Sequence, residues 1–336
     1  MKHLKYSDIA LVPQYSDCRS RADNSTSVYL FDRQFKLPII PANMKSVINI
    51  DLAKWMSNND YFYIMHRFDI DILKFVIKGN EEQWKNISIS LGVKEHDEKI
   101  IEYIREEKLR VDFITIDIAH GHSSSMKKMI NFIKSELNGP IIIAGNVATP
   151  DAVADLSSWG ADIVKVGVGQ GSPCTTKYKT GFTMPMFSCV RNCSRVSFDK
   201  ENGFMTSIAS ISEDFDIPDR IPIIADGGIE HNGDIAKALC VGACMVMAGS
   251  VFASCTDSPS VSSVINNVFH KAYFGSASLE NKGHNNNIEG KLTNIISNGM
   301  TYEKKLDEIK QDLQSSISYS GGNNLNSLYN TNYIEV

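Results

Sequence analysis

Short apolar runs recur along the chain, and each is followed by a turn of small or polar residues and then by a helical stretch. The apolar positions within a run are continuous rather than alternating, which is typical of strands that are buried on both faces of a parallel sheet. We therefore predict eight strands, at residues 37–43, 61–66, 87–92, 113–121, 140–146, 163–169, 221–228 and 244–250.

Between these runs, the apolar residues take the spacing of a helix, most clearly at 97–108 and 123–137. Ser123 precedes the second of these helices and is a candidate N-cap. Eight strand–helix units in regular order favour a (β/α)₈ TIM barrel over a doubly wound sheet. We predict an α/β fold with a single catalytic domain that covers residues 1–336.

Polar and glycine residues follow the predicted strands, at the end where barrel enzymes place their chemistry. They therefore predict a functional site at the carboxyl-terminal mouth of the barrel, formed by Asn43, His66, Asp117, Asn146, Gly167 to Gly171, Asp226 and Gly249.

Two segments lie outside the repeat. Residues 195–220 extend the sixth connection beyond the length of one helix, and residues 279–300 are polar and predict a mobile flap. A helix is expected over 302–317, followed by a Gly-Gly turn at 321–322 and a polar C-terminal tail.

The amino-acid composition of the chain narrows the range of possible functions. Hydrophobic residues make up 43% and charged residues 22%, as in ordinary globular enzymes. The net charge of −5 argues against nucleic acid as a partner. We expect no membrane association, because no apolar run approaches the roughly 20 residues of a bilayer span and the first residues lack the apolar core of a signal peptide. Seven scattered cysteines indicate reduced thiols and a cytoplasmic location.

The most informative segment is VKVGVGQGSPCTTKYKTG at 164–181, in which a strand enters a glycine-rich loop that ends at Cys174. Such a loop can approach an ion, a phosphate or a nucleotide closely. It is not a dinucleotide fingerprint, because Ser172 stands where the third glycine is required, and it lacks the Gly-Lys-Ser/Thr ending of a P-loop.

A cysteine thiol is mostly protonated at neutral pH, so a nucleophilic cysteine needs neighbours that favour the thiolate. Thr175, Thr176, Lys177 and Lys179 follow Cys174 and would supply hydroxyl groups and positive potential. A buried structural cysteine is the alternative. The position at the end of a glycine-rich loop favours the nucleophile.

The loop sequence GVGQGSPCTT resembles the catalytic-cysteine loop of the IMP dehydrogenase/GMP reductase family, which reads Gly-x-Gly-x-Gly-[Ser/Lys]-x-Cys-x-Thr. Further motifs similar to those of the family follow in family order at 6–16, 38–47, 64–67, 115–123, 145–150, 223–229, 273–278, 288–291 and 317–322. The resemblance implies a TIM-barrel oxidoreductase that holds a purine nucleotide covalently on Cys174 and exchanges hydride with a nicotinamide cofactor.

Within the family, the sequence is similar to the reductive branch. Dehydrogenase members usually insert a tandem regulatory domain after the second strand, whereas here that strand runs directly into the next helix. They also carry an Arg-Tyr pair in the flap, and residues 279–300 contain neither residue. Reductive members pair a threonine two residues beyond the cysteine with a flap glutamate, which matches Thr176 and Glu289. The implied reaction is the NADPH-dependent deamination of GMP to IMP and ammonia.

The resemblance also implies binding residues. For the nucleotide they are Ser172, Asp226, Gly227, Gly228, Gly249, Ser250, Gly275, Ser276, Ala277, Asn286 and Gly290, with Asp226 on the ribose hydroxyls. For NADPH they are Arg67, Asp117, Ile118 and Ala119, joined by Ser318, Tyr319, Ser320 and Gly321 of a neighbouring subunit in a homotetramer. A monovalent cation, K⁺, is implied on the backbone carbonyls of Gly169, Gly171 and Cys174.

Two positions depart from the family pattern: Pro173 replaces a small aliphatic residue, and Asn286 stands where the flap has an arginine. Three other functions stay open. These are an IMP dehydrogenase that lacks the regulatory domain, a catalytically silent purine-nucleotide-binding protein, and a flavin-dependent barrel oxidoreductase.

Overall fold

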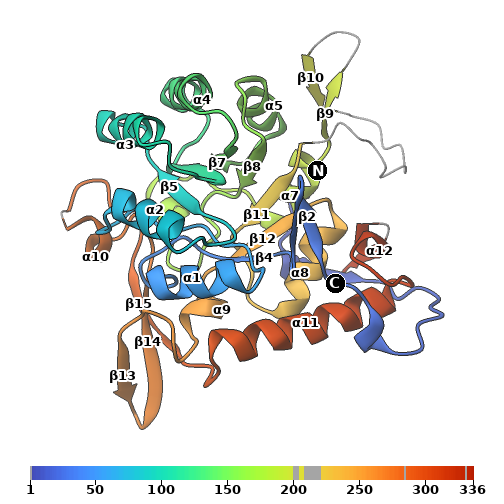
Figure 1. The fold of residues 1–336 in the computed structure, drawn as a ribbon. Coiled ribbons are helices and arrows are strands. Elements are labelled where there is room, and N and C mark those ends of the chain that lie inside the picture. Colours follow the sequence, from blue (N-terminus) through green and yellow to red (C-terminus); the bar gives the residue numbers. More distant parts are fainter. Residues whose placement is uncertain (1, 200–203, 208–220, 284, 330) are drawn as a thin grey trace.

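One curled parallel sheet forms the centre of the molecule (Figure 1). The computed structural model describes residues 2–199, 204–207, 221–283, 285–329 and 331–336. The strand order in this sheet is β4-β12-β11-β8-β7-β6-β5. These strands are β4 (Ile39–Pro41), β5 (Ser88–Leu91), β6 (Phe113–Asp117), β7 (Ile141–Val147), β8 (Ile163–Val166), β11 (Ile223–Asp226) and β12 (Met245–Ala248). Seven of the eight predicted strands are thus confirmed, in the order of a TIM barrel.

The second predicted strand, at residues 61–66, is not a regular strand. Only Met65 pairs, through an isolated parallel bridge to β5. Two side-chain hydrogen bonds add to this bridge: the Ser90 hydroxyl donates to the Met65 carbonyl at 2.7 Å, and the Tyr63 hydroxyl donates to the Asn86 carbonyl at 3.0 Å. The segment therefore occupies the one barrel position that the seven strands leave, next to β5, without a complete ladder of backbone hydrogen bonds.

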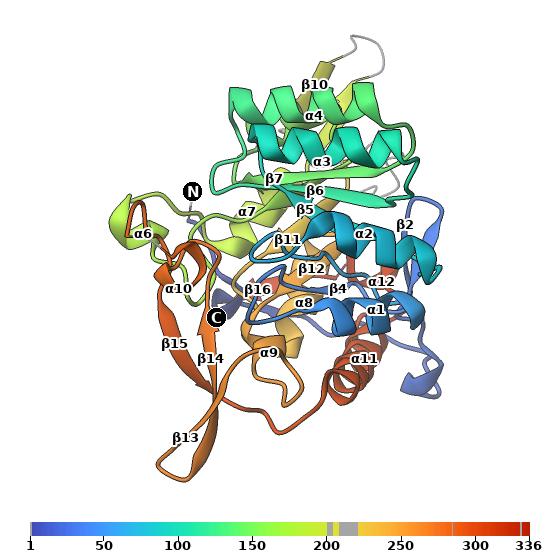
Figure 2. The same ribbon diagram turned by 60° about the vertical axis from the view of Figure 1, so that its left-hand side comes forward.

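Eight helices follow the eight barrel positions: α1 (Ile50–Asn58), α2 (Ile72–Glu81), α3 (Glu95–Glu106), α4 (Ser124–Glu136), α5 (Pro150–Ser158), α7 (Met186–Cys193), α8 (Asn232–Cys240) and α11 (Tyr302–Tyr319). Figure 2 shows α3 and α4 on the outer side of β5, β6 and β7. The predicted N-cap of α4 is confirmed, because the Ser123 hydroxyl accepts a hydrogen bond from the Met126 amide. Among the described residues, no helix is both long and apolar enough to span a bilayer.

The predicted extension at 195–220 begins with a hairpin of β9 (Val196–Asp199) and β10 (Phe204–Ser207). The residues between these strands, and those at 208–220, lie outside the described part of the chain. Before the barrel, the 3-10 helices η1 (Tyr6–Asp8) and η2 (Arg21–Asp23) precede a second hairpin of β2 (Val28–Leu30) and β3 (Arg33–Phe35).

The flap segment, residues 279–300, is more regular than the sequence suggested. It contains the short helix α10 (Leu279–Lys282) and the strand β15 (Leu292–Ile296). β15 joins β13 (Ser262–Ile265) and β14 (Val268–Phe274) in an antiparallel sheet, and the β13–β14 hairpin projects away from the barrel (Figures 1 and 2). Within the predicted flap, residues 292–296 therefore form a regular strand, because their backbone pairs with β14.

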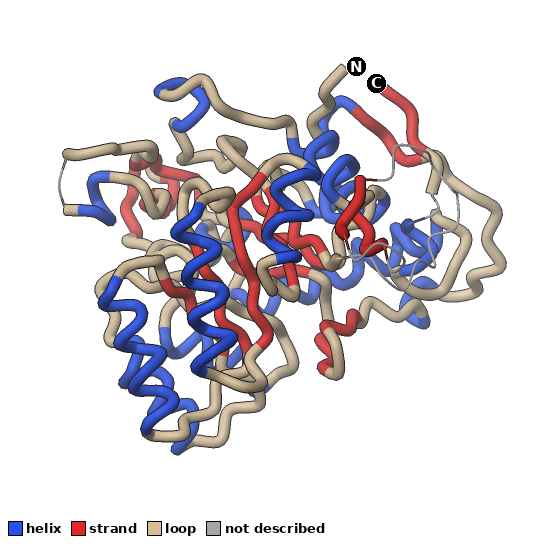
Figure 3. Tube along the Cα trace, turned by 90° about the horizontal axis from the view of Figure 1, so that it is seen from above, coloured by secondary structure: helices blue, strands red, loops and turns tan. Residues whose placement is uncertain are grey.

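The C-terminal tail also packs on its own chain. It forms α12 (Asn326–Tyr329), which buries Leu328, and β16 (Tyr333–Glu335), which pairs antiparallel with β1 (Ile9–Leu11). The two termini consequently lie side by side (Figure 3). The remaining short helices are α6 (Thr176–Lys179) and α9 (Ser250–Ala253).

Candidate active site

The loop after β8 carries Cys174 in a conformation that depends on glycine. Gly167 has a φ of 140°, and a Cβ at this position would lie 2.0 Å from the Asp226 carbonyl oxygen. No other residue fits this close approach between the loops after β8 and β11. Further along, the Cys174 amide donates to the Gly171 carbonyl at 3.0 Å, which closes a turn and fixes the thiol just before α6.

A chain of hydrogen bonds joins the three residues expected to be catalytic. The Cys174 thiol donates to Thr176 Oγ1 at 3.1 Å, and the Thr176 hydroxyl donates to Glu289 Oε2 at 2.7 Å. The three groups are half-buried and lie in an order through which a proton can pass between sulfur and carboxylate. The structure thus brings together a thiol, a hydroxyl and a carboxyl group from two distant parts of the chain.

Backbone pairing between the cysteine loop and the flap segment holds this arrangement. Cys174 and Gly290 form an isolated antiparallel bridge. The Thr175 amide donates to the Glu289 carbonyl at 2.8 Å, and the Lys291 amide donates to the Pro173 carbonyl at 2.9 Å. Pro173, which departs from the family pattern, therefore participates through its carbonyl, and the bridge does not require the amide hydrogen that proline lacks.

The residues expected to bind nucleotide surround the same loop. A Cβ on Gly227, after β11, would lie 3.4 Å from the Gly171 amide nitrogen, and one on Gly275, after β14, would lie 3.6 Å from Pro173 Cγ. The Glu289 amide donates to the Ala277 carbonyl at 3.0 Å. The neighbouring predicted positions lie on these same segments: Ser172 in the cysteine loop, Gly228 beside Gly227, Ser276 beside Gly275, and Asn286 and Gly290 in the flap segment.

The loop after β12 faces a buried tyrosine that the sequence analysis did not single out. A Cβ on Gly249 would lie 2.0 Å from the Tyr273 hydroxyl oxygen, so only glycine fits beside this ring. Ser250 follows and begins α9. Burial, together with the nearby charges of Asp226 and Cys174, raises the pKa of Tyr273 and keeps its hydroxyl protonated. Gly249, Tyr273 and Asp226 thus border the same region as Cys174.

A buried cluster of charges lies at the carboxyl ends of β6, β7, β8 and β11. Lys165 Nζ lies 3.0 Å from Asp117 Oδ1 and 2.6 Å from Asp226 Oδ2. The Asn146 amide donates to Asp226 Oδ2 at 2.8 Å and to the Gly167 carbonyl at 2.9 Å. Sequence analysis singled out Asp117, Asn146 and Asp226 but not Lys165, whose signal is a charged residue inside the apolar run IVKV.

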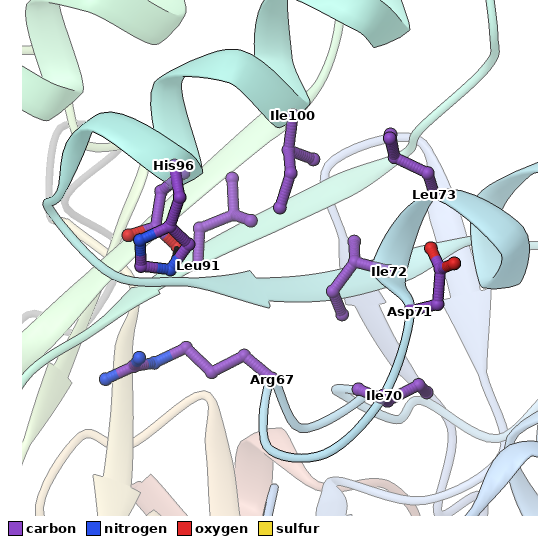
Figure 4. Close-up of a pocket in the computed structure, with 9 residues that line it drawn as sticks. Arg67, Ile70, Asp71, Ile72, Leu73, Leu91, His96 and Ile100 are labelled. Atoms are coloured by element: carbon purple, nitrogen blue, oxygen red, sulfur yellow. Dashed lines mark ion pairs between the residues drawn. The ribbon is translucent and has the colours of Figure 1, made fainter.

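Arg67 lies between this cluster and a cavity of about 220 Å³. One of its guanidinium nitrogens donates to the Asp117 carbonyl at 3.3 Å, while its buried Nε has no hydrogen-bond partner among the residues that the structure describes. Figure 4 shows the Arg67 side chain along one side of the cavity, with apolar side chains and His96 across from it. The cavity is lined by Arg67, Ile70, Asp71, Ile72, Leu73, Leu91, His96, Asp97 and Ile100.

The other residues expected to bind the dinucleotide fall into two groups. Ile118 and Ala119 follow β6, and the Ile118 amide donates to the Gly145 carbonyl at 3.1 Å. The second group, Ser318 to Gly321, ends α11 and contacts the N-terminal segment of the same chain, where the Gln14 amide donates to the Tyr319 carbonyl at 2.8 Å. The Tyr319 ring is 55% exposed, and the Arg21 guanidinium lies 5.0 Å from its centroid.

The barrel order and the cysteine loop define a class of protein. Residues 3–336 match the IMP dehydrogenase / GMP reductase domain, and the chain belongs to this family. It is 44% identical to the GMP reductase of Staphylococcus saprophyticus over 338 aligned positions, which cover 100% of this chain and 96% of the relative. The GMP reductases of Leptothrix cholodnii and Mesoplasma florum are 43% and 44% identical, over 99% and 98% of this chain and 96% of each relative.

Proposed function

We propose that the protein is a GMP reductase, an NADPH-dependent oxidoreductase that converts GMP to IMP and ammonia. The observation that carries this proposal is the hydrogen-bonded series from the Cys174 thiol through Thr176 to Glu289, at 3.1 Å and 2.7 Å. Relatives named GMP reductase align with almost the full length of the chain at 43–44% identity, which supports the same reaction.

In the first half of the proposed reaction, the Cys174 thiol passes its proton to the Thr176–Glu289 pair, and the sulfur adds to C2 of the purine. The bond between C2 and the 2-amino nitrogen then breaks. The departing nitrogen takes a proton that Glu289 delivers through Thr176, so that it leaves as ammonia. The purine stays attached to Cys174, which divides one difficult displacement into two easier steps.

In the second half, C2 gains a hydride and its bond to sulfur breaks, which releases IMP and the Cys174 thiolate. NADPH, when bound, supplies this hydride. Two features support such a ligand near Arg67: the cavity beside it reaches the end of β5 at Leu91, and its buried Nε–H has no acceptor among the described residues. We assign Asp117, Ile118 and Ala119 to the nicotinamide half of the dinucleotide, with Arg67 further out along the same ligand.

The nucleotide would lie across the loops after β8, β11, β12 and β14. Asp226 accepts hydrogen bonds from the ribose hydroxyls in this proposal, and the glycine and serine amides of the loops hold the phosphate. The position of Gly227 beside Gly171, and of Gly275 beside Pro173, supports a shared binding surface.

We also infer a monovalent cation, K⁺, on the carbonyls of Gly169, Gly171 and Cys174, since carbonyl oxygens are suitable K⁺ ligands. We infer a homotetramer in which Ser318 to Gly321 contact the dinucleotide on a neighbouring subunit, and the exposure of Tyr319 supports this assignment. The seven free cysteines support a cytoplasmic location.

The alternatives fit less well. A dehydrogenase would need a group to activate water, but the flap segment has neither arginine nor tyrosine, and its Glu289 is bonded to Thr176. The complete Cys174–Thr176–Glu289 series argues against a silent binding protein. A flavin enzyme would have no use for this nucleophile.

Absorbance at 340 nm tests the proposal. The enzyme should consume NADPH in the presence of GMP and form one IMP and one ammonia for each NADPH. Formation of NADH from IMP and NAD, without consumption of NADPH by GMP, would instead identify a dehydrogenase. Repeating the assay with dGMP tests Asp226, because the deoxy substrate lacks one ribose hydroxyl and should show a raised KM.

A further inference from the structure

Lys165 is a fully buried lysine in the middle of the barrel sheet. Its side chain is 2% exposed, and its neighbours in β8 are the apolar Val164 and Val166. A lysine is rarely buried unless it is paired, because removing an ammonium group from water is costly. Its presence in a strand that ends at the cysteine loop therefore requires a reason beyond packing.

All three hydrogens of the Lys165 ammonium have acceptors. They are Asp117 Oδ1, Asp226 Oδ2 and the Asn146 side-chain carbonyl oxygen. These acceptors come from β6, β11 and β7, so a single cation connects four strands of the barrel. Both carboxylates are more exposed than the lysine, which places Lys165 behind them.

The cluster contains two positive side chains, Lys165 and Arg67, and two negative ones, Asp117 and Asp226. Arg67 is the second cation, because its guanidinium bonds the Asp117 backbone and its charge acts on the Asp117 carboxylate. Burial disfavours the charged form of Lys165, but Asp117 and Asp226 outweigh this effect and raise its pKa. Burial likewise disfavours ionised Asp117, but the charge and hydrogen bond of Lys165, the charge of Arg67 and the hydrogen bond of Asn43 together outweigh it, so that the pKa of Asp117 is lowered.

Asp117 and Asp226 belong to different halves of the proposed site. Asp226 is assigned to the ribose of the nucleotide, and Asp117 to the dinucleotide. Among the described residues, Lys165 is the group that bonds both carboxylates. Without it, two carboxylates would face each other in a partly buried site, where like charges cannot readily both ionise.

We propose that Lys165 is a positioning residue that keeps Asp117 ionised and holds Asp117 and Asp226 oriented relative to each other, so that nucleotide and dinucleotide bind in one fixed geometry. This inference rests on the proposed function. The other groups that face the cluster are Arg67, Asn43, which donates to Asp117, and Tyr273, which lies near Asp226. None of these three bonds both carboxylates among the contacts of the described residues.

The first test needs no substrate. In Lys165→Met, burial no longer has Lys165 to oppose it, so the pKa of Asp117 should rise above its value in the unfolded chain, about 4. A group with a raised folded pKa contributes stability at low pH that is lost as the pH rises. The difference in Tm between Lys165→Met and the unchanged protein should therefore widen from pH 5 to pH 8.

The double variant Lys165→Met/Asp117→Asn separates charge from packing. It removes one of the two facing carboxylates, so the additional loss of Tm at high pH should disappear although the lysine is still absent. If Lys165→Met alone fails to fold, the double variant should restore folding. Failure of the double variant to restore either property would overturn the inference.

The second test uses the reaction. For Lys165→Met, kcat/KM for GMP should fall about tenfold from pH 8.5 to pH 6.5, as a carboxylate with a pKa raised into this range takes up a proton. The control is Lys134→Met, which removes an exposed lysine that is paired with Asp162. Its pH profile should be the same as that of the unchanged enzyme. A parallel profile for Lys165→Met would overturn the inference.

The two tests also distinguish this inference from the proposed function. If the unchanged protein does not reduce GMP, the proposed function fails, while the Tm measurements still decide the role of Lys165. If it does reduce GMP and Lys165→Met shows neither pH effect, the function stands and Lys165 serves packing alone.

Discussion

The side chains of Thr176 and Glu289 are joined by a hydrogen bond of 2.7 Å between Oγ1 and Oε2, although 113 positions separate them in the sequence. The bond connects α6, at the start of which Thr176 lies, with the flap segment. Glu289 has a second link to the same loop, because its backbone carbonyl accepts from the Thr175 amide. The carboxyl group is consequently held where it can exchange a proton with Thr176.

Replacement of Glu289 by glutamine should slow the release of ammonia far more than the transfer of hydride. Only the first half-reaction must protonate a leaving group, and loss of a general acid typically costs about 10²–10⁴-fold in rate. Single-turnover rates with GMP and NADPH should show this loss, whereas formation of the enzyme adduct from IMP and NADP should be largely retained. Glu280→Gln, an exposed carboxylate in α10, is the matched control. Equal losses in both directions would assign Glu289 a structural role instead.

Replacement of Cys174 by alanine should abolish turnover and the covalent adduct together. Intact-protein mass spectrometry after acid quench should detect a purine adduct on the unchanged enzyme and none on Cys174→Ala. The control is Cys18→Ala, which removes another partly exposed free cysteine and should leave the adduct in place. Substantial activity in Cys174→Ala would refute the assignment of the nucleophile.

Tyr319→Ala should raise the KM for NADPH without lowering the Tm. An exposed aromatic ring contributes little to folding but about 1 kcal/mol when it stacks on a ligand, which corresponds to roughly a fivefold change. The KM for GMP should be unaffected. Tyr29→Ala, an equally exposed tyrosine in β2, is the control and should change neither constant. An unchanged KM for NADPH would remove Ser318 to Gly321 from the proposed site.

Deletion of the whole tail would not test the same point. Residues 318–336 include β16, which pairs with β1, and Leu328, which is fully buried. Their removal should destabilise the barrel itself, since loss of one buried leucine side chain already costs about 2–5 kcal/mol. The effect on cofactor binding could then not be separated from the effect on folding.

His66 should make the folded state sensitive to acid. Burial, assisted by the positive charge of Lys45, lowers the pKa of His66 from 6.5 to about 4. The unfolded chain therefore binds this proton at a higher pH than the folded chain. The stabilising contribution of neutral His66 is present above pH 6.5 and should fall by about 3 kcal/mol as the pH drops to 4.

Urea denaturation at pH 7, 5.5 and 4.5 measures this loss. His66→Asn should flatten the dependence, because asparagine does not titrate, whereas His120→Asn should leave it unchanged since His120 is exposed. The same acid dependence in His66→Asn as in the unchanged protein would show that other groups are responsible.

The barrel could be predicted because its strands are buried on both faces, and burial on both faces produces continuous apolar runs such as Ile163–Val166. The segment 61–66 shows the limit of this signal. Its residues Phe62 to Met65 are as buried as those of a regular strand, yet Met65 pairs only through an isolated bridge, to which side-chain hydrogen bonds of Ser90 and Tyr63 are added. The pattern of apolar residues in a sequence indicates which segments are buried. It does not indicate which groups form hydrogen bonds with the backbone of a buried segment.

The antiparallel sheet of β13, β14 and β15 was missed for the opposite reason. It projects from the barrel, so residues such as Val264 and Phe269 stay exposed and no apolar run marks them. Lys165 was missed because one polar residue in an apolar run does not change the pattern. Its partners Asp117 and Asp226 were found only as separate strand ends, and their contact requires the barrel to close.

The pairing of β1 with β16 has a consequence for the order in which the molecule forms during translation. Ile9 lies opposite Glu335 in this pair, so β1 cannot form this pairing until residues 333–335 have left the ribosome. Strands β5 to β8 pair with neighbours close in the chain and can associate earlier. Until β16 has been made, β1 should therefore lack this pairing, and a protease should cleave the N-terminal segment of such chains more readily than that of chains that contain β16.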